Sequence, residues 1–185
     1  MSVRDALQLA TGGVVTKVDY RAVANLRDRV INDETRHKKP FARPDRIIES
    51  IFDLDVEFSA PSYGQLMQDH LLVFKPAVMS RTNSVYLTEK DRKYPVMLES
   101  NSFKEKATFN LPAGFAVDEV PNPVSLQTPF GKYATTYEVK GDKLIFTRSL
   151  TMSRATVSVD RYKDVRDFFT GMLNAEQSPV VLIRK

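Results

Sequence analysis

Histidine is the side chain that most often serves as a general base near neutral pH, and this sequence has two, His37 and His70. A serine or cysteine nucleophile needs such a base beside it. The chain contains no cysteine and no G-x-S-x-G pattern, while His37 lies in a basic stretch and His70 precedes an apolar run. We therefore expect no catalytic residue here, and predict that the chain is not an enzyme by itself.

A row of carboxylates at Asp53, Asp55 and Glu57 is the best candidate for a metal site. Their spacing puts all three on one face of a single strand. Calcium takes about six to eight oxygen ligands, which one strand does not supply, and no second acidic cluster accompanies it. We expect no metal, and either a solvated face or one that pairs with basic residues of the next strand. The glycines are scattered and form no phosphate-binding loop, so no cofactor is predicted.

Aromatic residues are frequent in the last third of the chain, where Tyr133, Tyr137 and Phe146 stand at strand spacing. Aromatic rings stack on the apolar faces of ligands, so these three could line a surface that binds a glycan or peptide. The same spacing is typical of core residues and cross-strand pairs. Arg148 interrupts the apolar alternation of its strand, which indicates either a sheet edge or a buried ion pair.

The elements that would position these residues begin with helical patterns. Residues 3–10 start with capping-box spacing, and Asp19 is placed to cap a second helix over residues 20–34. Such helices could mediate homo-oligomerisation. Residues 36–44 are basic and contain prolines, which is typical of a solvated connector, although such a run could also meet a membrane surface or an acidic partner.

From residue 52 onward the pattern changes to the alternation of β-strands. A helix is expected after Asp160, followed by a buried final strand. The predicted fold class is α+β, mainly β: N-terminal helices followed by an antiparallel β-sandwich-like or partly open barrel sheet with one packed C-terminal helix. Strands are predicted over residues 52–58, 63–75, 93–99, 103–111, 132–139, 143–152 and 180–183.

Two domains follow from this change of pattern: a helical segment with its connector over residues 1–45, and a β-rich domain over residues 46–185. The formal net charge of +4 arises from 27 basic and 23 acidic residues dispersed along the chain, so we expect no nucleic-acid binding. No apolar run approaches the ~20 residues needed to span a bilayer. The first residues lack the pattern of a signal peptide, which predicts a cytoplasmic protein if Met1 is the natural start.

A series of short runs in the β-rich part is similar to the pattern of a known family. The runs are RKYPV at 92–96, FNLPAGF at 109–115, VPNPV at 120–124, TPFGKY at 128–133, YEVKG at 137–141 and TRSL at 147–150. In order and spacing, residues 50–185 resemble the C-terminal region of bacterial transglutaminase-like proteins. In that family a papain-like core is flanked by β-rich domains of unknown function.

The resemblance implies a non-catalytic role. The catalytic Cys, His and Asp of the family lie in its core, and none of them carries over to this chain. The resemblance therefore implies an accessory domain of a larger transglutaminase-like or cysteine-protease-like parent, where it would pack on or position the catalytic core or its substrate. Such parents generally carry a secretion signal, which implies a periplasmic or cell-envelope location. An independent glycan- or peptide-binding module is the alternative.

Overall fold

The computed structural model describes residues 14–21, 53–60, 63–78 and 89–185. The chain divides into two compact units, residues 1–61 and residues 62–185. The boundary that the sequence predicts after residue 45 lies outside the described residues. In the first unit, β1 (Val14–Arg21) and β2 (Asp53–Ser59) form a two-stranded antiparallel sheet.

The predicted fold class is wrong at the N-terminus, where a strand replaces the start of the second helix. Asp19, the expected helix cap, pairs with Asp55, and Tyr20 pairs with Leu54 in the β1–β2 ladder. The run VVTKVDYR is rich in valine, threonine and tyrosine, residue types that favour strands, and β2 pairs with it. The rest of the predicted N-terminal helices, residues 3–10 and 22–34, and the connector over 36–44 lie outside the described residues.

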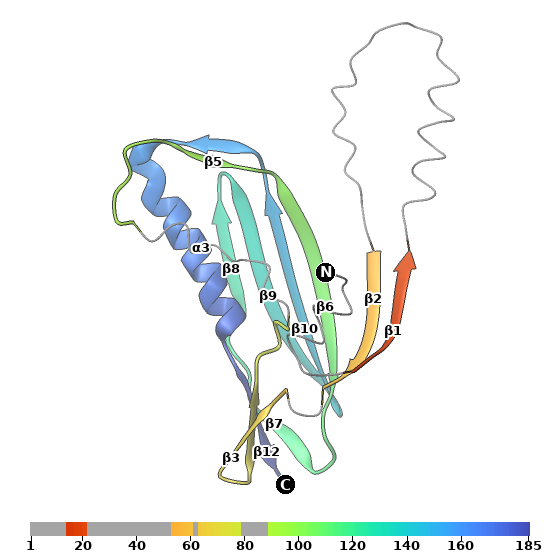
Figure 1. The fold of residues 1–185 in the computed structure, drawn as a ribbon. Helices are drawn as coiled ribbons and strands as arrows, with labels where there is room; N and C mark the ends of the chain where they lie inside the picture. Colours follow the sequence, from red (N-terminus) through yellow and green to blue (C-terminus); the bar gives the residue numbers. More distant parts are fainter. Residues whose placement is uncertain (1–13, 22–52, 61–62, 79–88) are drawn as a thin grey trace, which may run out of the picture. The chain divides into compact units, whose positions relative to one another are not determined.

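The second unit is built around a four-stranded antiparallel sheet, called the long sheet (Figure 1). Its order is β6-β10-β9-β8. The predicted hairpin at Gly141 joins β9 to β10, and Gly141 has a φ of +59°, a left-handed conformation that glycine adopts without steric cost. The strands are β6 (Asn101–Asn110), β8 (Val124–Thr128), β9 (Gly131–Lys140) and β10 (Lys143–Met152).

A second antiparallel sheet, the short sheet, has the order β3-β4-β12-β7. A single strand was predicted over residues 63–75, but Gln68 and Asp69 both have positive φ and fold it into a tight hairpin. The strands are β3 (Gln65–Met67), β4 (Leu71–Phe74), β7 (Phe115–Glu119) and β12 (Val180–Arg184). A further pair is formed by β5 (Val96–Leu98) and β11 (Ala155–Val157).

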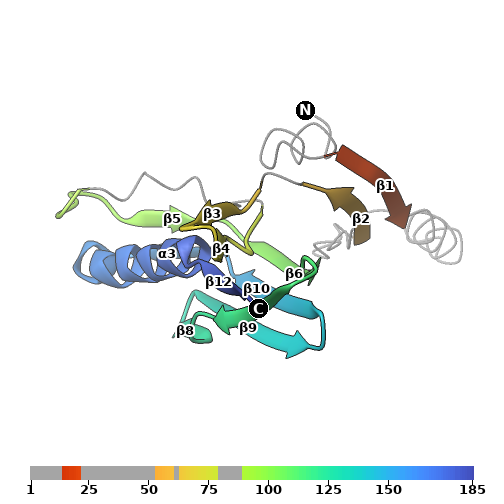
Figure 2. The same cartoon turned by 90° about the horizontal axis from the view of Figure 1, so that it is seen from below.

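One helix packs on the sheets, as the sequence predicts. It is α3 (Tyr162–Gln177), which follows the short 3₁₀ turn Val159–Arg161. In both views α3 lies over one face of the long sheet (Figures 1 and 2). None of the helices in the described ranges is long and apolar enough to cross a membrane.

The core lies on one face of the long sheet and has two parts. The first lies under α3 and includes Tyr133, Leu150, Val165 and Met172. The second lies under the short sheet and is centred on Leu144, Val180 and Leu182. The predicted single sandwich or partly open barrel is therefore replaced, in residues 62–185, by three antiparallel sheets and a helix that shares one face of the long sheet with the short sheet.

Truncation of Leu144 tests the second part of the core. Leu144 is fully buried, whereas its neighbour Ile145 points to the opposite, partly exposed face. We expect Leu144→Ala to lower the free energy of unfolding by roughly 2–5 kcal/mol, because it leaves a cavity. Ile145→Ala, the matched control, should cost clearly less. Urea denaturation measures both, and equal losses would contradict this assignment of the core face.

Candidate functional site

The structure places the three predicted ligand-face residues in the interior. Tyr133 and Phe146 are 1% and 0% exposed, and Tyr137 is half-buried with its ring centroid 5.3 Å from that of Phe146. A sugar or peptide cannot stack on rings that protein atoms already cover. The aromatic surface suggested by the sequence is therefore not found at Tyr133, Tyr137 and Phe146, which are core residues.

Arg148 lies at the boundary between the two parts of the core, and it is completely buried. Its Nη2 is 2.8 Å from Glu105 Oε2, and its Nη1 is 2.7 Å from Glu176 Oε1. Glu105 stands directly opposite Arg148 on β6, whereas Glu176 comes from the last turn of α3. The guanidinium also lies 5.5 Å from the ring centroid of Phe103. Of the two readings that the sequence left open for Arg148, the structure shows the buried ion pair.

The position of Glu176 is explained by this cluster. An acidic residue in the last turn of a helix faces the negative end of the helix dipole, which is unfavourable. Glu176 is nevertheless 4% exposed, and the last turn of α3 contains no basic residue to offset it. A buried carboxylate needs a charged or hydrogen-bonding partner, and Arg148 supplies one. The ion pair thus fixes the C-terminal end of α3 on the long sheet.

Tyr133 borders the same cluster. Burial raises the pKa of its phenol well above the ordinary value of 10.0, and the nearby charge of Glu176 raises it further. Burial also raises the pKa of Tyr63 and of Tyr137. These phenols therefore keep their protons to a higher pH than an exposed tyrosine does.

His70, the histidine within the described residues, lies in the β3–β4 hairpin. Its Nδ1 is 2.6 Å from the backbone oxygen of Gln68, and its own carbonyl accepts a hydrogen bond from the backbone N–H of Arg184. The ring is exposed and its partner is a local turn carbonyl. This arrangement suits a structural histidine. Within the described ranges, no group of three or more His, Cys, Asp or Glu residues is placed to hold a metal.

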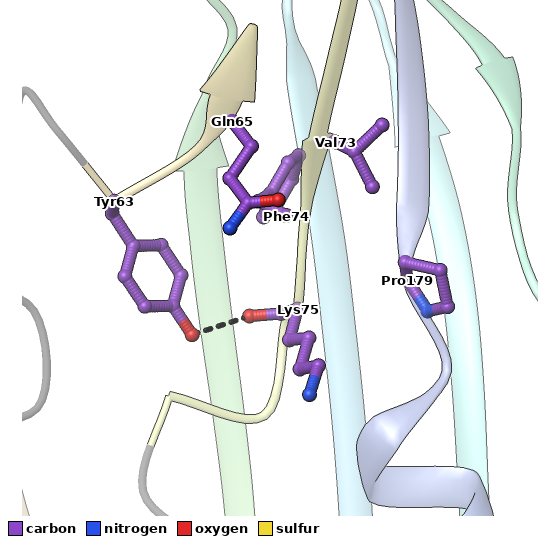
Figure 3. Close-up of a pocket in the computed structure, with 6 residues that line it drawn as sticks. All are labelled: Tyr63, Gln65, Val73, Phe74, Lys75 and Pro179. Carbon is purple, nitrogen blue, oxygen red and sulfur yellow. Dashed lines mark hydrogen bonds between the residues drawn. The ribbon is translucent and has the colours of Figure 1, made fainter. Parts of the chain in front are cut away.

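A small pocket of about 200 Å³ lies beside β3 and β4 (Figure 3). The Tyr63 hydroxyl donates a 2.7 Å hydrogen bond to the backbone oxygen of Lys75 at its rim. Gln65, Val73 and Pro179 line it as well. Ligand pockets usually measure roughly 300–1,000 Å³ and gather several convergent polar groups. The pocket is smaller and mostly apolar, so it is a poor site for catalysis but suits the insertion of an apolar side chain.

Sequence reasoning missed Glu105 and Glu176 as the ion-pair partners of Arg148. The signal was present for Glu105, since it is a single acidic residue on the face that β6 shares with Phe103, Ala107 and Phe109. Glu176 carried no such mark, because its partner comes from a strand 28 residues earlier in the chain.

Comparison with known proteins gives one family and one fold relative. A family model described as "Domain of Unknown Function with solved-structure structure (DUF3858)" matches residues 69–182. A crystal structure described as that of a "putative protease" from Parabacteroides distasonis is similar with a TM-score of 0.54 and 15% sequence identity. The likeness covers 64% of this chain and 24% of that chain, and at this identity it establishes the fold alone. No curated protein matches the chain.

Removal of one charge from the Arg148 cluster should be strongly destabilising. We expect Arg148→Met to lower the free energy of unfolding by about 3–5 kcal/mol, because Glu176 is left buried without its partner. The double variant Arg148→Met/Glu176→Met should regain much of this loss. Lys140→Gln, which breaks the exposed Lys140–Glu138 pair, should cost less than ~1 kcal/mol. Urea denaturation distinguishes these cases, and a mild effect of Arg148→Met would contradict the assigned role.

Alkaline pH should destabilise the fold through Tyr133. Above pH 10 the unfolded chain loses the phenol proton while the folded chain retains it, so the free energy of unfolding falls as the pH rises. One such group contributes a slope of up to ~1.4 kcal/mol per pH unit. Tyr133→Phe should therefore show a shallower decline than the parent chain between about pH 10 and 11. Urea titrations at several pH values measure the slopes, and identical slopes would refute the assignment.

Proposed function

Because the chain belongs to the DUF3858 family of domains of unknown function, we propose that it is a non-catalytic accessory domain that packs on the catalytic core of a longer, transglutaminase-like protein. The fold relative supports a longer parent, since the matched region makes up 24% of that chain, which is described as a "putative protease". The resemblance of the runs at 92–96, 109–115 and 128–133 to those of transglutaminase-like proteins supports the kind of core. A parent of that kind would place the domain in the periplasm or cell envelope.

The observation that carries the proposal is the outer face of the short sheet. In β4 and β12, Leu72 and Leu182 point inward to the core. The alternate residues point outward, and they are apolar too. This outer apolar face consists of Met67, Leu71, Val73, Val181 and Ile183, which lie side by side in the register of β3, β4 and β12.

Apolar residues at adjacent positions are usually covered by other protein atoms, and these five are partly exposed. Met67 and Ile183 are 52% and 37% exposed, and the other three residues are half-buried. Strands with apolar residues on both sides are typical of sheets that are covered on both faces. An exposed apolar patch of this kind marks a protein interface. The pocket beside Tyr63 opens next to Val73 and offers a place for an apolar side chain of the partner.

A catalytic core in the same parent chain is the partner that suits this face best. A domain tethered to its partner is present at high effective concentration, so a modest apolar face is enough for docking. The independent glycan- or peptide-binding alternative lost its main support with the burial of Tyr133 and Phe146.

Binding between this chain and the separately expressed remainder of its parent tests the proposal. By isothermal titration calorimetry, Ile183→Lys should weaken the complex at least ~10-fold, because it places a charge in an apolar interface. Lys132→Glu, on the long sheet, is the control for a surface charge change and should bind as the unchanged chain does. A native gene product of 21.0 kDa in fractionated source cells would overturn the proposal, as would thiol-independent hydrolase activity of this chain.

A further inference from the structure

The face of the long sheet that points away from α3 carries a cluster of lysines. The inward residues of β10 are Leu144, Phe146, Arg148, Leu150 and Met152, and all are buried. The residues between them, and their cross-strand partners on β6 and β9, form the opposite face. This basic face carries five lysines, all exposed: Lys104, Lys106, Lys132, Lys140 and Lys143.

The charge on the basic face is concentrated. Glu138 is the acidic residue among the strand positions of this face, and it pairs with Lys140 at 2.8 Å. Five lysines and one glutamate give the face a charge of +4, which equals the formal net charge of the whole chain. The rest of the sequence is therefore balanced overall. Among the described residues, no ion pair is recorded for the other four lysines of this face.

Hydroxyl groups run between these lysines. Thr147, Ser149 and Thr151 succeed one another on the outward side of β10. In the ladder, Thr147 stands opposite Lys106 and Ser149 opposite Lys104, both on β6, while Thr151 stands opposite Lys132 on β9. Each hydroxyl thus has an ammonium group on a neighbouring strand. An oxyanion above β10 would meet one charged and one neutral donor at each step of about 7 Å along the strand.

Protection of the sheet edge does not account for the whole cluster. Lysine on an edge strand discourages pairing with another chain, and Lys104 and Lys106 lie on the edge strand β6. Lys132 and Lys143 lie on β9 and β10, which are paired on both sides. They have no edge to protect, and they extend the positive charge across the sheet.

The shape and side chains of this face select the kind of ligand. The basic face is made of exposed side chains at successive positions along β6, β9 and β10, which favours a ligand that lies along the strands. The strand positions of the face hold no aromatic residue on which a base or sugar ring could stack. Recognition would then depend on repeated charge. Lysine paired with a hydroxyl donor suits phosphate oxygens, which accept several hydrogen bonds at once.

We propose that the basic face binds a linear phosphate-bearing polymer along β10. The polymer's phosphates lie between the lysines of β6 and those of β9, and the hydroxyls of Thr147, Ser149 and Thr151 complete their coordination. This inference is independent of the docking role of the short sheet, since the two surfaces belong to different sheets.

Inorganic polyphosphate titrated into the whole chain by calorimetry tests the proposal. We expect Lys106→Gln/Lys132→Gln to weaken binding about 30-fold, the effect of two lysines that face an anionic surface. The plot of log K against log salt should also become shallower by about 1.4. Lys90→Gln/Lys93→Gln removes the same charge from exposed positions outside the sheet, and it should leave both quantities nearly unchanged.

Three outcomes would overturn the proposal. The first is no binding of polyphosphate at low salt by the unchanged chain. The second is an equal loss of affinity in the two double variants, which would show attraction by net charge alone. The third is equal or tighter binding of poly-glutamate or of phosphatidylglycerol vesicles, which would assign the face to carboxylates or to a lipid surface. Thr147→Val/Thr151→Val, which keeps all charges, should weaken polyphosphate more than poly-glutamate.

Discussion

The packing of this domain depends on one buried guanidinium, that of Arg148, which is neutralised by two carboxylates. Arg148 sits in the middle of β10, where a side chain of any apolar type would satisfy the alternation of the strand. Its charge can stay buried only if β6 contributes Glu105 and α3 contributes Glu176. The ion pair with Glu176 holds the last turn of α3 against β10. The helix itself ends at Gln177, just before Pro179, and β12 of the short sheet begins at Val180.

The two faces of the long sheet divide the work of the domain. The inner face is apolar apart from the Arg148 cluster and Thr135, and the helix and the short sheet cover it together. The outer face is left to lysines and hydroxyls. The short sheet differs, because its outer face is apolar and partly exposed at Met67 and Ile183. The exposed surfaces of the two sheets therefore differ in chemistry, one apolar and the other basic.

The local sequence pattern correctly predicted those helices and strands whose secondary structure depends mainly on their own residues. The β9–β10 hairpin, α3 and the final strand follow from alternation, helical spacing and a glycine turn, and the structure has them. Residues 14–21 show where local pattern fails. A helix cap was expected at Asp19, but this residue pairs with Asp55, on a strand more than 30 residues away in the chain. The β3–β4 turn was not predicted, because Gln68 and Asp69 adopt positive φ and the turn contains no glycine, the residue type that usually indicates such a turn. The spacing of Tyr133 and Phe146 is typical of core residues but also allowed a ligand face, and only tertiary packing decides between the two.

The position of β12 has a consequence for how the chain is synthesised. It is the last of the four strands of the short sheet in chain order, yet it lies between β4 and β7 and pairs with both. While the ribosome is still making α3, the apolar strand β4 has only the three-residue β3 as a partner, and β7 has none in this sheet. Vectorial folding from the N-terminus cannot complete such a sheet. The nascent domain therefore leaves β7 and one edge of the apolar strand β4 unpaired until β12 has been synthesised.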